Sequence, residues 1–155
     1  MSEGPLILIQ VDGTPGDGAG RAGVGVVVRA ATGRVLQWRC GCVAAQTNNE
    51  AEYEALLLGL RLALARYRGR TVRCLSDSRL LVDQLNGRAV SRVAPLQRRY
   101  AEAVRLCGLI GQVEVVYVPR AVNQLADALA WEALGGTRQL LRWAVGQGGS
   151  QDGTE

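Results

Sequence analysis

The chain opens with alternating apolar and polar positions, a pattern that predicts strands buried on one side. Residues 6–11 (LILIQV) predict a first strand that places Gln10 and Asp12 on one face, with Asp12 at its carboxyl end. Residues 22–30 (AGVGVVVRA) and 34–42 (RVLQWRCGC), separated by a short turn, predict an antiparallel hairpin. The chain is therefore expected to begin with three strands joined by tight connections.

Helical and strand-like segments alternate in the rest of the chain. The segment from Thr47 to about Arg66 is rich in alanine and leucine and predicts a long helix, with Gly69 as its stop. The later segments predict, in order, a strand at 71–76, a short helix at 78–86, a helix at 95–110, a strand at 112–118, a helix at 121–134 and a short amphipathic piece at 137–145. Hairpin strands followed by strand–helix alternation predict the α/β class, with a mixed sheet covered by helices.

Length and composition predict one globular domain. The chain has 155 residues, of which 48% are hydrophobic and 21% charged, and we assign residues 1–145 to the domain and 146–155 to a disordered tail. No apolar run approaches the roughly 20 residues that span a bilayer, and the apolar start has no basic region ahead of it. We expect a cytoplasmic protein without a membrane partner. The net charge of +4 comes from arginine alone and favours anionic partners.

A glycine-rich segment raises the question of nucleotide binding. Residues 18–23 (GAGRAG) match the dinucleotide pattern G-x-G-x-x-G, which requires the glycines to open a helix. The β-branched residues that follow predict a strand instead. A phosphate-binding P-loop needs a lysine, and the chain has none. We interpret the segment as a connection between two strands and expect no nucleotide cofactor.

Acidic residues recur where predicted elements begin and end. Asp12 follows the first strand, and Asp77 ends the fourth strand directly before a helix. Asp77 is equally suited to cap that helix. Asp127 lies in the last predicted helix, where a single acid is as often exposed to solvent as functional.

Three glutamates compete at the start of the long helix. Glu50 completes the capping-box pattern that begins at Thr47. Glu54 shares a helical stripe with Arg61 and is expected to face solvent. Glu52 lies on the face that carries the small or apolar residues Leu56, Gly59 and Ala63, so it is predicted to be a carboxylate on the buried face.

A cluster of Asp12, Glu52, Asp77 and Asp127 would need a positive partner. Two like charges about 4 Å apart repel by about 4 kcal/mol at an effective dielectric constant of 20. The chain offers neither lysine nor histidine, and carboxylates without imidazole or thiolate suit Mg²⁺ or Mn²⁺. The four cysteines lack the spacing of a zinc site and are expected to be buried thiols.

Four stretches resemble the type I ribonuclease H family in the family's order. They are VDGT (11–14), TNNEAEYEAL (47–56), SDSRLLVDQLNG (76–87) and YVPRAVNQLADALA (117–130). The resemblance implies the ribonuclease H fold, a five-stranded mixed sheet with the first three strands antiparallel and helices on both faces. It also implies an endonuclease that cuts the RNA strand of RNA–DNA hybrids with two metal ions, and so removes hybrids and RNA primers.

The resemblance also implies roles for individual residues. Asp12, Glu52, Asp77 and Asp127 would be the catalytic acids and would hold two Mg²⁺ ions, with Mn²⁺ as the alternative. Recognition of the hybrid would fall to Gly13, Thr14, Asn48 and Asn49, with Arg79, Arg120 and Asn123 as further candidates. Asn48 and Asn49 have helix capping as their alternative role.

Two departures from the family pattern change these expectations. Many relatives carry a histidine before the last acid, and its absence predicts slower turnover unless Arg120 substitutes for it. Many also carry a basic protrusion where residues 87–112 hold one helix and a short linker, which predicts modest, salt-dependent affinity. A binding module that has lost activity stays open as the alternative function, and double-stranded RNA as an alternative substrate. We expect a monomer.

Overall fold

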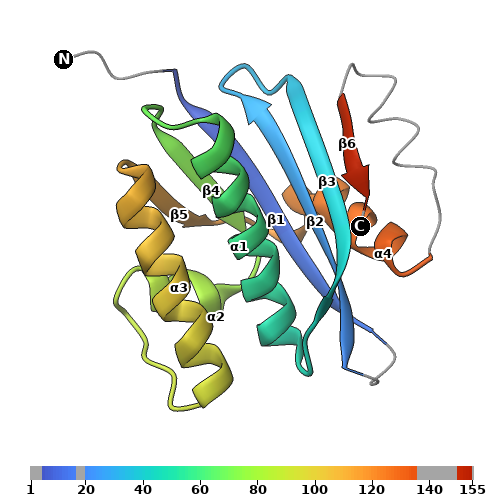
Figure 1. Cartoon of the computed structure of the whole chain (residues 1–155), viewed down its shortest axis with the longest axis vertical. Coiled ribbons are helices and arrows are strands. Elements are labelled where there is room, and N and C mark those ends of the chain that lie inside the picture. The colour runs from blue at the N-terminus through green and yellow to red at the C-terminus, as the bar shows by residue number, and fades with distance from the viewer. Residues whose placement is uncertain (1–4, 17–19, 136–149, 155) are drawn as a thin grey trace.

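The computed structural model describes residues 5–16, 20–135 and 150–154, and its centre is one mixed β-sheet (Figure 1). Strands β1, β2 and β3 form an antiparallel meander, and β4 and β5 add to β1 in parallel. The order across the sheet is β5-β4-β1-β2-β3-β6. The α/β class and the arrangement of the five expected strands are confirmed. The strands are β1 (Ile7–Pro15), β2 (Arg21–Ala30), β3 (Val35–Ala44), β4 (Val72–Ser76), β5 (Val113–Tyr117) and β6 (Ser150–Thr154).

Helices cover both faces of this sheet. Figure 1 shows α1 and α3 in front of the strands and α4 behind them. The helices are α1 (Asn48–Arg66), α2 (Arg79–Leu85), α3 (Ala94–Ile110), the 3₁₀ helix η1 (Arg120–Asn123) and α4 (Gln124–Ala133). The single helix predicted over 121–134 is therefore two short elements. Among the described residues, no helix is long and apolar enough to cross a membrane.

The long helix α1 rests on the sheet through a stripe of small and apolar side chains. Leu56 and Ala63 are completely buried, and a Cβ atom at Gly59 would lie 3.0 Å from Val11 Cγ1. Burying one leucine of this kind contributes about 2 kcal/mol. The predicted buried face of this helix is confirmed, and the same face carries Glu52 at its first turns.

The first strand is longer than its sequence pattern indicated. β1 continues to Pro15, so Asp12 lies inside the strand and not at its end. The parallel pairing with β4 nevertheless stops at the pair Gln10–Leu75, and beyond it β1 pairs with β2 alone. Asp12 therefore lies just past the point where β1 and β4 part, and Asp77 directly follows β4.

The end of the chain corrects the prediction of a disordered tail. Residues Ser150–Thr154 form β6, which pairs in parallel with β3. The outer edge of β3 offers backbone donors and acceptors that a further strand can satisfy, whatever its composition. Residues 146–149 and 155, and the amphipathic piece predicted at 137–145, lie outside the described residues.

The cysteines are only partly as predicted. Cys40 and Cys74 are buried and Cys107 is half-buried, but Cys42 is exposed. The Cys42 thiol donates a hydrogen bond to the carbonyl oxygen of Ala133 at 2.9 Å. Cys42 lies near the end of β3 and is exposed there, whereas the preceding residue, Gly41, is buried.

Candidate active site

Two glycines of β2 let α4 lie directly on the sheet. Gly25 is the cross-strand partner of Asp12, and a Cβ atom at Gly25 would lie 2.2 Å from the carbonyl oxygen of Ala126. A Cβ atom at Gly23 would lie 2.1 Å from the carbonyl oxygen of Ala130. Any side chain at these positions would push α4 away. Because Ala126 precedes Asp127, the close approach delivers the Asp127 carboxylate beside Asp12.

A third glycine does the same for α1 on the opposite side of β1. A Cβ atom at Gly13 would lie 2.2 Å from the carbonyl oxygen of Ala51. The Gly13 backbone N–H donates to Glu52 Oε1 at 2.8 Å. This bond fixes the Glu52 carboxylate one residue from Asp12, so the predicted placement of Glu52 at the sheet is confirmed.

Asp77 directly follows β4 and lies near Asp12 and Glu52. Its carboxylate is not used to cap α2, the helix that follows it. The cap of α2 is Ser78, whose Oγ accepts from the Leu81 N–H at 3.3 Å. Carboxylate oxygens of Asp12, Glu52 and Asp77 lie within 4.8 Å of one another. Asp127 joins them through a side-chain hydrogen bond with Asp12. The other three acids predicted from the sequence thus lie around Asp12.

Asp12 and Glu52 are buried and Asp77 is half-buried, and the pKa values of these three acids are raised. Burial first, and then the charge of Glu52, raises the pKa of Asp12 from 3.8 to about 10. Burial raises the pKa of Glu52 from 4.5 to about 7, although the Gly13 bond and Arg120 oppose the rise. Burial also raises the pKa of Asp77 above its usual range, again against Arg120. Without a cation, burial and the neighbouring acids therefore favour the protonated form of Asp12.

The donor set suits a hard divalent cation. Every ligand in the group is a carboxylate oxygen, which Mg²⁺ and Mn²⁺ prefer over the nitrogen and sulfur ligands typical of zinc. A cation would also remove the repulsion that raises these pKa values. The site therefore fits a divalent metal on the chemistry of its own residues.

The capping alternatives at the start of α1 are resolved. Thr47 is the N-cap, and its Oγ1 accepts from the Glu50 N–H at 3.1 Å. Asn48 and Asn49 are the first two residues of the helix, the former exposed and the latter half-buried. They are therefore not the caps of α1, and they lie at the end of the helix that carries Glu52.

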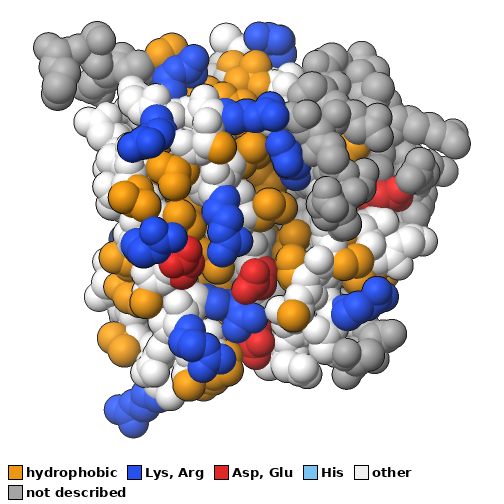
Figure 2. Space-filling view, in the orientation of Figure 1, with side chains coloured by type: hydrophobic (Ala, Val, Ile, Leu, Met, Phe, Trp, Pro, Cys, Tyr) orange, Lys and Arg blue, Asp and Glu red, His pale blue; other side chains and the backbone are white. Residues whose placement is uncertain are grey.

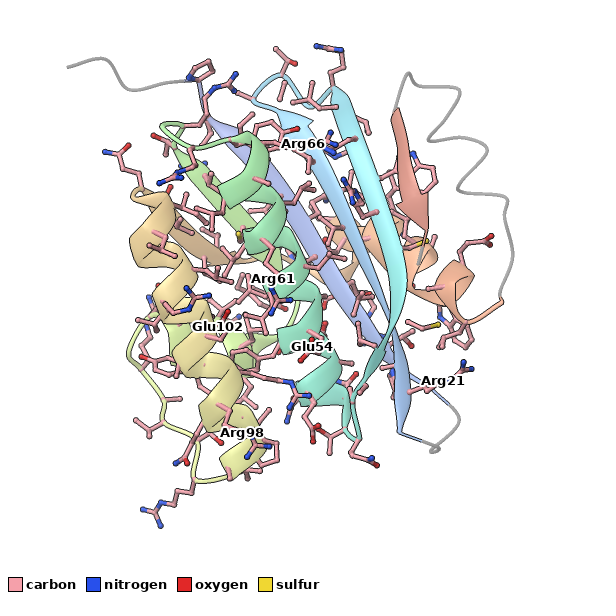
Figure 3. The ribbon with its side chains drawn as sticks, viewed as in Figure 1. Arg21, Glu54, Arg61, Arg66, Arg98 and Glu102 are labelled. Carbon is pink, nitrogen blue, oxygen red and sulfur yellow. The ribbon has the colours of Figure 1, made fainter. Side chains whose placement is uncertain are left out.

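Glu54 corrects an expectation, since it does not face open solvent. Arg99 of α3 donates to Glu54 Oε2 at 2.7 Å, and its guanidinium also lies 3.4 Å from Glu50 Oε1. Figure 3 shows Glu54 on the front helix α1, beside α3. The acids that flank Glu52 thus join α1 to α3, and Glu52 alone points to the sheet.

The remaining predicted contact residues lie at different depths. Thr14 is half-buried on β1, two residues beyond Asp12. Arg120 is exposed at the start of η1, and its charge acts on both Glu52 and Asp77. Arg79 is exposed at the start of α2, with its guanidinium 3.8 Å from the centre of the Tyr117 ring.

Asn123 is not where a substrate contact would be. Its side chain is completely buried, and Nδ2 donates to the carbonyl oxygen of Val11 at 2.8 Å. The prediction of Asn123 as a direct substrate contact is therefore wrong, because the residue ties η1 to β1 next to Asp12.

A second hydrogen-bonded connection between β1 and η1 was not predicted from the sequence. The Gln10 amide donates to the carbonyl oxygen of Val122 at 2.8 Å and accepts from Arg29 Nε at 2.7 Å. The helix-approach role of Gly23 and Gly25 was also not predicted. An isolated glycine inside a β-branched strand is a known signal of close backbone approach and could have revealed them.

Arginines are dispersed over the face that α1 and α3 form. Figure 2 shows blue side chains spread across this face with a few acids between them. On this face the arginines do not form one continuous basic stripe. The acidic cluster therefore marks the candidate site more sharply than the charge of this surface does.

Comparison with known proteins agrees with the fold. A family model described as reverse transcriptase-like matches residues 10–133. The bifunctional protein Rv2228c of Mycobacterium tuberculosis is 34% identical over 134 residues, which make up 86% of this chain and 36% of that protein. Ribonuclease HI of Halobacterium salinarum is 34% identical over 123 residues, 79% of this chain and 61% of that protein. The chain thus spans less than two thirds of these curated relatives.

Solved structures are similar over nearly their whole length. The ribonuclease H1 of Halobacterium salinarum superposes with a TM-score of 0.79 at 32% identity, covering 84% of this chain and 98% of that one. LC11 ribonuclease H1, solved in complex with an RNA/DNA hybrid, gives a TM-score of 0.78 at 29% identity, covering 83% and 96%. With the match over residues 10–133, these similarities place the chain in the reverse transcriptase-like family, as a homologue of the ribonucleases HI.

Proposed function

We propose that this protein is an endonuclease that hydrolyses the RNA strand of RNA–DNA hybrids. The observation that carries the proposal is the convergence of Asp12, Glu52 and Asp77, with carboxylate oxygens within 4.8 Å of one another, joined by Asp127. Homology to the ribonucleases HI and similarity to a ribonuclease H1 that binds an RNA/DNA hybrid support it. Removal of hybrids and RNA primers is the cellular role we assign.

Asp12, Glu52, Asp77 and Asp127 would hold two Mg²⁺ ions, or Mn²⁺ in their place. Bound metal supplies an activated water and stabilises the departing 3′ oxygen. Asp12 is the central ligand, since its carboxylate contacts the other three acids. The Gly13 N–H holds the Glu52 carboxylate in one orientation, so little reorganisation is needed when the substrate arrives.

Residues around the acids would bind the duplex. Asn48 and Asn49 at the start of α1, with Gly13 and Thr14 on β1, are placed to contact the wide minor groove of the hybrid and its 2′-hydroxyls. Arg120, whose charge acts on Glu52 and Asp77, and Arg79 at the start of α2 would supply positive charge for phosphate oxygens. Arg120 stands in for the histidine that the chain lacks, as a charge that acts on Glu52 and Asp77.

The cellular setting and assembly are also part of the proposal. We place the protein in the cytoplasm as a monomer that works without a nucleotide cofactor. These assignments rest on composition and on the family resemblance.

One cleavage assay tests the proposed function. Labelled RNA–DNA hybrid, double-stranded RNA and double-stranded DNA of one sequence are incubated with Mg²⁺ or Mn²⁺. We expect cleavage of the RNA strand of the hybrid, and loss of at least a thousandfold in rate for Asp77→Asn, because a metal ligand is removed. Binding of the hybrid without cleavage by the wild type would favour an inactive binding module. Equal cleavage by wild type and Asp77→Asn would refute the assignment.

A further inference from the structure

A hollow lies between the end of β1, the start of β2 and the end of α4. Its lining residues are Pro15, Gly16, Arg21, Trp131 and Leu134, and it measures about 280 Å³. We propose that this hollow binds the sugar–phosphate backbone of the RNA strand next to the phosphate that is cleaved. The inference rests on the proposed function and adds to it a binding subsite outside the acids.

Two elements connect the hollow to the acids. Trp131 follows Asp127 by four residues on α4, so both side chains lie on one face of the helix, one turn apart. Pro15 follows Asp12 by three residues on β1, about 10 Å along the strand. A strand whose phosphate lies at the acids therefore continues past the hollow.

The lining offers a flat apolar surface for a ribose ring and a positive charge for a phosphate group. Trp131 is 53% exposed, with Pro15 and Leu134 as apolar neighbours in the hollow. An exposed indole with an apolar surround offers a flat surface for a ribose ring. Of the five described residues that line the hollow, Arg21 is the charged one, and its guanidinium fork suits a phosphate oxygen.

The position of Arg21 agrees with this assignment. Figure 3 shows Arg21 at the end of the sheet where α1 begins, which is the end that carries Asn48 and Asn49. The hollow therefore lies at the same end of the molecule as these amides. The cleaved strand is the occupant because it is the strand that the acids hold, and the A-form minor groove exposes its ribose rings.

Binding measurements on uncleaved hybrid test the subsite. In an Asp77→Asn background, the dissociation constant of a fluorescent RNA–DNA hybrid is measured for Trp131→Ala, Trp131→Phe and Arg21→Gln. We expect Trp131→Ala to weaken binding about tenfold, Trp131→Phe to retain most of the affinity, and Arg21→Gln to lower the salt slope by about one. Arg61→Gln on the outer face of α1 and Leu109→Ala on α3 are matched controls and should bind like the parent.

A scan with neutral phosphates identifies the strand. Single methylphosphonates are placed along either strand, and one position in the RNA strand next to the cleavage site should weaken binding to the parent but not further to Arg21→Gln. Sensitivity only in the DNA strand, or parent-like binding by both Trp131→Ala and Arg21→Gln, would overturn the subsite. Cleavage by wild type with no effect of these variants refutes the subsite alone, whereas absence of any hybrid binding by wild type removes the proposed function as well.

Discussion

Asp12 on β1 lies opposite Gly25 on β2 in the antiparallel register, and the absence of a side chain at Gly25 brings α4 against the sheet at Ala126. The residue after Ala126 is Asp127, which hydrogen-bonds with Asp12. Gly13 likewise lets α1 lie close to the sheet, and the Gly13 N–H donates a hydrogen bond to the carboxylate of Glu52 on that helix. The site therefore depends on two helices that approach β1 and β2 more closely than a side chain at Gly13 or Gly25 would permit.

Substitution Gly25→Ala is expected to separate Asp127 from Asp12. The new Cβ atom would lie 2.2 Å from the Ala126 carbonyl oxygen, so α4 must shift. We expect a loss of about 2 kcal/mol in unfolding free energy and a fall of at least tenfold in kcat for hybrid cleavage. Gly108→Ala is the control, since nothing lies within 4 Å of the added atom. Full activity of Gly25→Ala would contradict the role assigned to this glycine.

The metal-free protein should become less stable as pH rises. The folded pKa values of Asp12 and Glu52, about 10 and about 7, lie above the ordinary values of 3.8 and 4.5. The folded state therefore keeps protons that the unfolded state releases. The penalty from Glu52 grows from about pH 4.5 and is complete above about pH 7, while that from Asp12 continues to about pH 10.

Urea unfolding in the presence of a chelator measures this dependence. We expect the wild type to lose several kcal/mol between pH 5 and pH 8, because each unit of pKa shift is worth about 1.4 kcal/mol. Asp12→Asn should be more stable than wild type at pH 8, with a shallower dependence, because the variant removes the central charge. An unchanged slope in Asp12→Asn would show that the carboxylates do not interact.

Helix capping and catalysis are expected to depend on two different neighbouring residues, Ser78 and Asp77 respectively. Ser78→Ala removes the cap of α2, in which Ser78 Oγ accepts from the Leu81 N–H, and should cost about 1 kcal/mol of stability. Hybrid cleavage at a temperature where the protein is folded should persist. If Ser78→Ala were as inactive as Asp77→Asn, the division of roles would be wrong. Thermal melting and initial rates on the same preparations provide the comparison.

Gln10 is expected to matter for the position of η1. Replacement by leucine leaves Arg29 Nε and the Val122 carbonyl without the bonds they make to Gln10, at a cost of about 1–3 kcal/mol. Because η1 also carries Arg120, kcat should fall while KM changes little. Thr71→Val removes a hydrogen bond at the far end of the sheet and serves as a control that should leave kcat unchanged.

The sequence predicted that four acids would lie close together, and the structure brings Asp12, Glu52 and Asp77 together, although Asp12 lies inside β1 and not at its end. Glu52 was separated from Glu50 and Glu54 by the helical stripe through Leu56 and Ala63, and the structure buries that stripe. Periodicity carries no information on which of two adjacent residues caps a helix, so Asp77 and Ser78 could not be distinguished.

Other features depend on contacts between distant segments. The burial of Asn123 follows from its bond to Val11, far away along the chain. The pairing of Glu54 with Arg99 requires α3 to pack beside α1, and β6 arises from the open edge of β3. Local patterns do not encode such partners, and the polar composition of 150–154 is typical of a tail.

A melting experiment with added metal tests most directly whether the four acids form a cation site. Thermal unfolding at pH 8 is followed for wild type and Asp12→Asn with a chelator and with increasing Mg²⁺ or Mn²⁺. Saturating metal at about a hundred times its dissociation constant should stabilise wild type by about 2.7 kcal/mol, and the variant should show little or no shift. A melting temperature that metal leaves unchanged in wild type, or raises equally in both proteins, would contradict the account.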